Sequence, residues 1–285
     1  MRLGLLISIW LIVLSLGARA SVQSALFVLR RPAALARAAA AIFVVVPAFA
    51  VVLAATAPLA PAIKFAIVAM SVAPVPPILP YKQMKAGGQG DYAVGLLVAA
   101  SLISMVLTPL LVTLAAHLLR TEAHVAVGQV ARPLLLSIGI PLAAGMLLHA
   151  ASEGAAVSLA DVAQKVGFLL LLVLFAVMVG AAARQILGLL GNGAALAIAA
   201  TVAVGLLAGH LLGGGRDSGA LALAAATRHP GVALAIAEMS FPDQRKSITA
   251  AILLYLLITA LVSAPYARWM RGRSPQLDET AAPRS

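Results

Sequence analysis

The chain has no cysteine, few charged residues and few aromatic residues. Of its 285 residues, none is cysteine, 10% are charged and 5% are aromatic. The absence of cysteine excludes disulfide bonds, thiolate metal sites and cysteine nucleophiles. The low charge excludes an ordinary soluble domain, in which about a quarter of the residues are charged. Acidic residues are the scarcer kind, because nine aspartate and glutamate residues stand against twenty lysine and arginine residues.

The sequence motifs of the common enzyme classes are also missing. The chain contains no HExxH zinc motif, no phosphate-binding glycine loop and no nucleophile elbow. Four histidines, His117, His124, His149 and His210, lack the spacing of metal ligands. The sequence therefore predicts no enzyme activity, no metal site and no bound cofactor.

Apolar residues dominate what is present. They make up 62% of the chain, and the mean hydropathy is +1.06. A run of about 20 apolar residues is long enough to cross the hydrocarbon layer as a helix. We therefore predict an all-α polytopic membrane protein, in contact with the lipid bilayer, with about nine transmembrane helices. The predicted spans are 3–18, 37–57, 61–80, 90–118, 130–150, 163–183, 193–212, 217–238 and 247–268.

Both ends of the chain need interpretation. The basic Arg2, the apolar run 3–16 and Ala18-Arg19-Ala20 imitate a signal peptide. Because another basic loop and further spans follow, we interpret this segment as a retained transmembrane helix. Residues 1–270 are predicted to form a single transmembrane transporter domain, and 271–285 a disordered cytoplasmic tail.

The basic residues carry information about orientation. A net charge of +11 would suggest a nucleic-acid partner in a soluble chain. Here the basic residues fall mostly in loops, and the larger share lies on the side that contains the C-terminus. Cytoplasmic loops are enriched in lysine and arginine. We therefore expect a cytoplasmic C-terminus, an external N-terminus and no nucleic-acid partner.

Two of the predicted spans contain helix breakers. The third has four prolines between Pro74 and Pro80, and the eighth contains Arg228-His229-Pro230-Gly231. Proline removes a backbone donor and clashes with the preceding turn, so both spans should break near mid-membrane and cross one another. Freed backbone groups are tolerated there only inside protein or beside a water-filled cavity, and we expect a cavity.

The two broken spans occupy related places in the chain. Pro109 follows Pro74 by 35 residues, and Pro265 follows Pro230 by 35 residues. The helices that follow the two broken spans contain similar sequences, LISMVLTP and LITALVSAP. The third and the eighth span are five spans apart. Because successive spans alternate in direction across the membrane, equivalent helices would point in opposite directions. This pattern indicates an inverted repeat, with one copy at about 1–120 and the other at about 130–270, as in secondary transporters.

Arg228 is the strongest candidate binding residue. A charge at the bilayer centre costs about 2.5–3.5 kcal/mol or more, so it should face the bundle interior. We expect it to bind a substrate anion or to act as a fixed cation; the alternative is a structural arginine bonded to carbonyls freed at the break. His229 is a candidate proton relay, although a lone intramembrane histidine is more often structural. Thr227, Pro230 and Gly231 complete this candidate substrate-binding segment.

The third span adds weaker candidates. Pro77 belongs to its break, and Lys82 and Gln83 follow it. Either Lys82 or Gln83 lines a cavity opposite Arg228, or both belong to a cytoplasmic basic anchor. In the seventh span, Gly205, Gly209 and Gly213 recur on one helix face, which predicts close helix packing.

The sequence segments SVAPVPPILPYKQMKAGG, TPLL and ATRHPGVALAIA together resemble the bile acid:sodium symporter family, including its bacterial relatives. The resemblance covers nearly the whole chain. It implies a panel domain, a core domain with two crossing discontinuous helices, and substrates such as bile acids, pantoate-like acids and keto acids moved with sodium. It also implies the inner membrane of a bacterium.

The resemblance fails at the sodium ligands. The family's glutamate position falls on Ala224, its Gln-Asn pair on Arg228-His229, and its Ser-Asn pair near Gln83-Met84. Sodium is a hard cation that needs several oxygen ligands, and most of them are absent here. We therefore expect transport of a small organic anion, a carboxylate, without sodium. The alternatives are a proton-coupled or uncoupled carrier of a neutral or cationic solute, and a non-transporting membrane receptor or scaffold.

Overall fold

The computed structural model describes residues 2–119, 126–191, 193–240 and 242–273. These residues form helices and short connections and contain no strand. Helices are expected because lipid offers no partner for backbone amides, and a helix pairs them internally. The elements are α1 (Arg2–Gly17), α2 (Val22–Leu26), α3 (Pro32–Ala39), η1 (Ala40–Val45), α4 (Val46–Thr56), α5 (Pro61–Val72), α6 (Leu79–Lys85), α7 (Gly90–Leu118), α8 (Val127–Leu134), η2 (Leu135–Gly139), α9 (Ile140–Ala151), α10 (Glu153–Ala181), α11 (Ala183–Leu189), α12 (Ala194–Gly213), η3 (Gly215–Asp217), α13 (Ser218–Ala226), α14 (Pro230–Ser240), η4 (Pro242–Gln244) and α15 (Arg245–Arg273).

Several helical segments are long and apolar enough to cross a membrane. Within the described residues there are seven, and two shorter apolar helices, Leu3–Gly17 and Pro61–Val72, accompany them. The protein is therefore an integral, polytopic membrane protein. The seven are Pro32–Thr56, Gly90–Leu118, Val127–Ala151, Glu153–Ala181, Ala194–Gly213, Gly215–Ile236 and Arg245–Arg273.

Some helix boundaries differ from the predicted spans. α10 begins at Glu153, whereas the sequence predicted a start at 163. Within its early turns, Asp161 and Gln164 accept hydrogen bonds from the Arg19 side chain. α15 extends through Arg273, so the predicted tail from 271 begins as helix.

Both proline-containing segments are interrupted, as their sequences predict. α5 ends at Val72 and α6 starts at Leu79, with Pro80 in its first turn, where proline is tolerated. α13 ends at Ala226, and α14 starts at Pro230. A proline at the first helical position loses no internal hydrogen bond, which explains why helix resumes there.

The two interruptions meet. The His229 backbone amide donates to the Pro74 carbonyl at 2.8 Å. α5 packs against α14, and α6 packs against α13, so each half-helix contacts the opposite half of the other segment. A backbone group freed in one break thus satisfies a group freed in the other.

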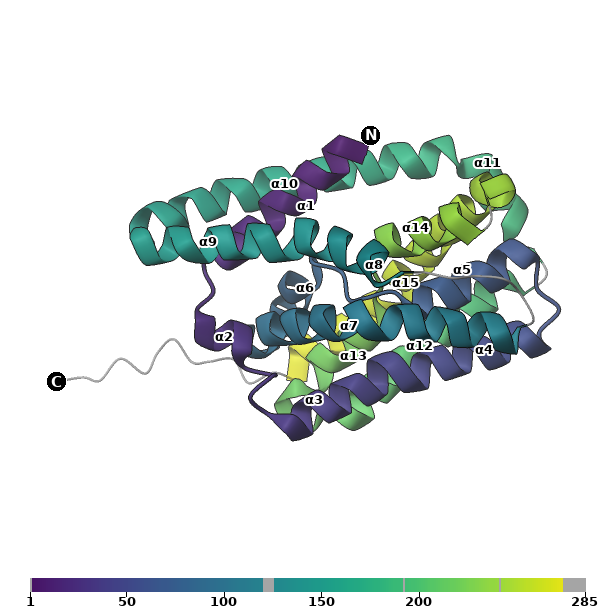
Figure 1. Ribbon diagram of the computed structural model, residues 1–285, viewed down its shortest axis with the longest axis horizontal. Helices are drawn as coiled ribbons and strands as arrows, with labels where there is room; N and C mark the ends of the chain where they lie inside the picture. The colour runs from purple at the N-terminus through teal and green to yellow at the C-terminus, as the bar shows by residue number, and fades with distance from the viewer. Residues whose placement is uncertain (1, 120–125, 192, 241, 274–285) are drawn as a thin grey trace.

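The helices form two groups. α1 packs against α9 and α10, and Figure 1 shows these three lying together along one edge of the molecule. We call them the α1–α9–α10 layer. The remaining long helices, including both interrupted segments, form the main group, in which α12 packs along α13.

The glycine face of α12 explains this last contact. A Cβ atom at Gly209 would lie 2.4 Å from the Ala222 Cα, and one at Gly213 would lie 2.4 Å from the Ser218 Cα. Only glycine permits so close an approach of two helix backbones. The packing role predicted for Gly205, Gly209 and Gly213 is confirmed.

We expect Gly209→Ala to lower the thermal unfolding temperature of the detergent-solubilised protein. The added methyl group forces α12 away from α13, and overpacking of this kind costs about 1–3 kcal/mol. Gly188→Ala in α11 is the matched control, because a Cβ there meets nothing within 4 Å. Equal unfolding temperatures for the two variants would contradict the close contact.

Candidate functional site

Arg228 lies at the junction of the interruptions and is enclosed by protein. Arg228 is 1% exposed, and its Nη2 donates to the Ile42 carbonyl at 2.9 Å. Ile42 belongs to η1, a π-helical turn within the continuous helix Pro32–Thr56. In a π-helix the Ile42 carbonyl would accept from residue 47, which is Pro47 and has no N–H. Arg228 supplies the donor that the proline lacks.

The Arg228 guanidinium keeps unused hydrogen-bonding capacity. Its Nε and Nη1 are buried and have no partner in the part of the chain that the structure describes. The hydroxyl-bearing Tyr255 of α15, also 1% exposed, lies within electrostatic range of it. A buried cation with free donors creates a local preference for an anion.

His229 contributes a third unpartnered nitrogen. Its Nδ1 accepts from the Gly231 amide at 3.1 Å, and the residue is 6% exposed. Because Nδ1 acts as an acceptor, the neutral ring carries its proton on Nε2. This Nε2 is buried and has no partner among the described residues. His229 and Arg228 thus both present N–H groups that the surrounding protein leaves unsatisfied.

The predicted binding residues are brought together only in part. Thr227, Arg228, His229, Pro230 and Gly231 lie at the second interruption. This interruption is hydrogen-bonded to the first one, which contains the buried Pro77.

The other two candidates lie elsewhere. Gln83 donates from Nε2 to the Ala220 carbonyl at 2.6 Å, so it joins α6 to α13. Ala220 lies about 9 Å along the helix axis from the last residue of α13, since an α-helix rises 1.5 Å per residue. Lys82 is exposed on α6. Neither residue is placed beside Arg228.

Sequence reasoning missed two residues at this site, Ile42 and Tyr255. Pro47 signals an unpaired carbonyl in this span, but in an α-helix that carbonyl would be the one of Phe43, and only the π-helical turn shifts it to Ile42. The position of Tyr255, well inside the predicted span 247–268, was the available signal for that residue. Thr259 lies one helical turn further along the same face of α15, and its buried Oγ1 has no partner within the described residues.

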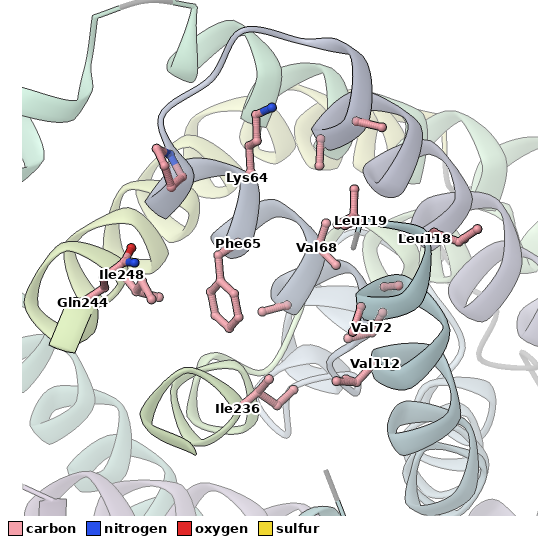
Figure 2. A pocket seen from close by; sticks show the side chains of 16 residues that line it. Lys64, Phe65, Val68, Val72, Val112, Leu118, Leu119, Ile236, Gln244 and Ile248 are labelled. Atoms are coloured by element: carbon pink, nitrogen blue, oxygen red, sulfur yellow. The ribbon is translucent and has the colours of Figure 1, made fainter. Parts of the chain in front are cut away.

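The expectation that the broken helices line a cavity is not met at Arg228. A cavity of about 390 Å³ lies among α4, α5, α7, α14 and α15 (Figure 2), and Lys64 is its charged lining residue. None of the eight predicted binding residues lines it. The reason is that protein satisfies the freed backbone groups: the Val72 carbonyl, for example, accepts from Thr108 Oγ1 at 2.9 Å.

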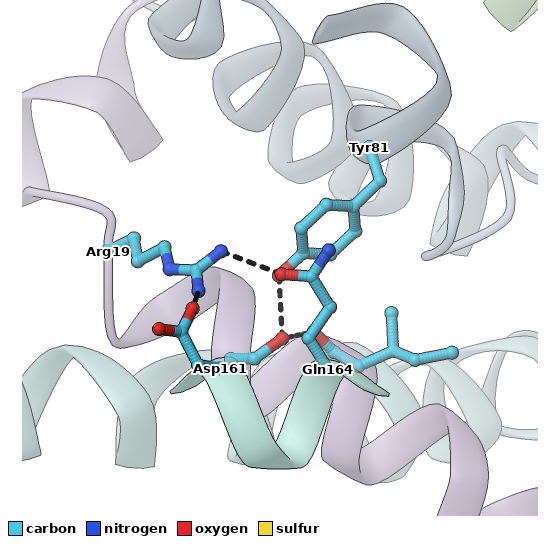
Figure 3. A network of polar contacts seen from close by, with 6 residues as sticks. Arg19, Tyr81, Asp161 and Gln164 are labelled. Atoms are coloured by element: carbon cyan, nitrogen blue, oxygen red, sulfur yellow. Dashed lines mark hydrogen bonds and ion pairs between the residues drawn. The ribbon is translucent and has the colours of Figure 1, made fainter. Parts of the chain in front are cut away.

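A polar and aromatic contact joins the α1–α9–α10 layer to the main group. Tyr81 of α6 shares a hydrogen bond of 2.6 Å with Ser15 of α1, and its ring meets Phe168 of α10 edge-on at 5.5 Å. Figure 3 shows Tyr81 beside the group in which Arg19 binds Asp161 and Gln164. The half-helix that follows the first interruption is therefore attached to the layer.

These features define a polytopic membrane protein in which two interrupted helices enclose a buried cationic site. The sequence profile of the Sodium Bile acid symporter family matches residues 6–209, well over half of the chain, and the chain belongs to that family. The comparison with curated proteins gives no match. The matched region ends within α12, so Arg228 and the second interruption follow it.

We expect a coupling free energy between Ser15 and Tyr81 in a double-mutant cycle of thermal unfolding. Ser15→Ala and Tyr81→Phe each remove the same hydrogen bond, so the double variant should lose less than the sum, by about 0.5–1.5 kcal/mol. Ser71→Ala is the control partner for Tyr81→Phe, since the Ser71 hydroxyl donates within its own helix to Val68. Additive losses for Ser15 and Tyr81 would show that the contact contributes nothing.

Proposed function

We propose that the protein is a secondary transporter of a small organic anion, a carboxylate, working by alternating access. The observation that carries the proposal is the buried Arg228, with two unpartnered donors at the junction of the interruptions. An intramembrane charge is costly unless it is paired, and a carboxylate offers oxygens in the geometry that a guanidinium prefers. Membership of a transporter family supports the same function.

The proposed architecture has nine spans, with α1 and each interrupted segment counted as one span. The interrupted segments cross at mid-membrane, and the chain is an inverted repeat of about 1–120 and about 130–270. This arrangement supports a binding site at the membrane centre. The charge distribution favours a cytoplasmic C-terminus and an external N-terminus, in the inner membrane of a bacterium.

Alternating access requires two bodies that move against each other. We assign these roles to the α1–α9–α10 layer and the main group, which Ser15 and Tyr81 join at one end. Because Arg228 is closed off from both described cavities, exposing it requires separation of helices around the interruptions.

Transport is proposed to proceed without sodium. Ala224, at the position of the family's glutamate, has no side-chain oxygen. The carbonyls of Ile42, Val72 and Pro74 each already accept one hydrogen bond, which reduces their capacity to bind a cation in its place. A guanidinium about 4 Å from a sodium ion would add repulsion of about 4 kcal/mol at an effective dielectric of 20. We infer that Arg228 provides the positive charge that sodium provides in coupled relatives.

A proton-coupled carrier is the second candidate. The unpartnered Nε2 of His229 favours it, because a histidine beside a binding site can gain or release a proton during the cycle. A neutral or cationic solute and a non-transporting receptor are weaker alternatives, since neither uses the unpaired donors of Arg228.

We expect Arg228→Ala to abolish carboxylate uptake while the protein remains folded in the membrane. The ligand is first chosen by a thermal-shift screen with a bile acid, pantoate and keto acids, because binding raises the apparent stability. Uptake of that carboxylate into proteoliposomes is then measured. Arg228→Lys should recover only part of it, since an ammonium lacks the planar fork of the guanidinium.

The exposed Arg30 supplies the matched control, and Arg30→Ala should transport normally. Normal uptake by Arg228→Lys, together with failure of Arg228→Ala to fold, would assign the arginine a structural role bonded to Ile42 and refute anion binding.

We expect uptake to continue when potassium or choline replaces sodium on both sides of the proteoliposome membrane. The expected rate is unchanged, because Ala224 and Arg228-His229 stand where the family has side-chain oxygen ligands for sodium. Strict dependence on a sodium gradient would show that other oxygen atoms form a sodium site.

A further inference from the structure

A second cavity, of about 760 Å³, lies at the opposite end of the main group from the first. It is bounded by the loop before α7, the ends of α12 and α15, and the start of α13. Its titratable lining residues, His210, Arg216 and Arg273, are all of basic type. Among the described residues, the lining is Ala86, Gly87, Gly88, Gln89, Gly90, His210, Gly215, Arg216, Ser218, Gly219, Met270 and Arg273.

The basic side chains around this cavity are positioned by aromatic residues of α15. His210 Nδ1 shares a hydrogen bond of 2.8 Å with the Tyr266 hydroxyl. The Arg273 guanidinium carbon lies 4.2 Å from the centroid of the Trp269 ring. Stacking of this kind restricts an arginine while its N–H edge stays available for hydrogen bonds. Two of the three basic groups are therefore held in place before any ligand arrives.

The backbone around the cavity also favours a ligand of negative charge. Arg271 Nε donates to the Lys85 carbonyl at 2.9 Å, which attaches the end of α15 to the loop region beside the cavity. The 29-residue helix α7 begins at Gly90, on the cavity wall, and N-terminal amides carry partial positive charge. The acid of its first turn, Asp91, accepts a hydrogen bond from Ser24 and does not line the cavity.

We propose that this cavity binds a phosphate-bearing anion. Two guanidinium groups suit phosphate, because each can donate two parallel hydrogen bonds to its oxygens. The glycine-rich wall lets the ligand approach the backbone closely. The cavity volume falls in the range of sites that hold a small organic ligand.

Two sources share this phosphate chemistry: a phospholipid headgroup and a soluble phosphate. Tyr266 and Trp269 beside the cavity are residues that concentrate at membrane surfaces, where both sources are accessible. The proposal does not depend on the transport function, because neither Arg216 nor Arg273 belongs to the Arg228 site.

The test uses the purified full chain and native mass spectrometry, with dioleoylphosphatidylglycerol and inorganic pyrophosphate as separate probes. Dioleoylphosphatidylcholine, whose headgroup is zwitterionic, is the lipid control. We expect the double variant Arg216→Ala/Arg273→Ala to bind the anionic probe at least about tenfold more weakly than the parent protein does. The matched control, Arg30→Ala/Lys165→Ala, removes two exposed basic residues elsewhere and should bind like the parent protein.

Each result has a defined meaning. Selective loss of phosphatidylglycerol identifies a headgroup site, and selective loss of pyrophosphate identifies a site for a soluble phosphate; both support the proposal. Equal binding by the two double variants, or no binding of either probe by the parent, overturns it. Arg216→Lys/Arg273→Lys keeps both charges and should bind with intermediate affinity, which provides a readout if the alanine variant does not fold.

Discussion

Backbone groups released by a helix interruption find no water in an apolar interior, so the protein itself must provide their partners. The centre of this molecule is organised by that constraint. The His229 amide binds the Pro74 carbonyl, and Thr108 binds the Val72 carbonyl. Each interruption is therefore completed by a residue distant in sequence. The two segments depend on one another, and the helices that carry them are held together at this junction.

Arg228 extends the same principle to a third break in regular helix. In the π-helical turn at Ala40–Val45, the π-type donor to the Ile42 carbonyl would be the N–H that Pro47 lacks. The guanidinium fills that role with one nitrogen and keeps two others unpartnered. The structural and functional interpretations of this arginine are thus compatible, because one group has enough donors to serve both.

The contacts between the two helix groups differ in kind from those within the main group. The Ser15–Tyr81 hydrogen bond joins the α1–α9–α10 layer to α6, and one such bond contributes only about 0.5–1.5 kcal/mol. By contrast, the glycine face of α12 holds α13 at backbone contact. The two groups also meet where α8, which continues into α9, packs against α7, so relative movement of the groups would have to change this packing as well.

The sequence by itself determined the membrane class, the positions of both interruptions and the packing face of α12, because hydrophobic run length, proline and glycine spacing act locally. It also singled out Arg228, since an isolated charge in an apolar run is costly anywhere in a membrane. Only the tertiary structure decided which groups complete the site. Ile42 and Tyr255 lie far from Arg228 in the chain, and Gln83 turned out to bond Ala220 instead of lying beside Arg228. Pairing across such separations depends on how helices pack, and a local pattern does not encode which buried carbonyl a long side chain will reach.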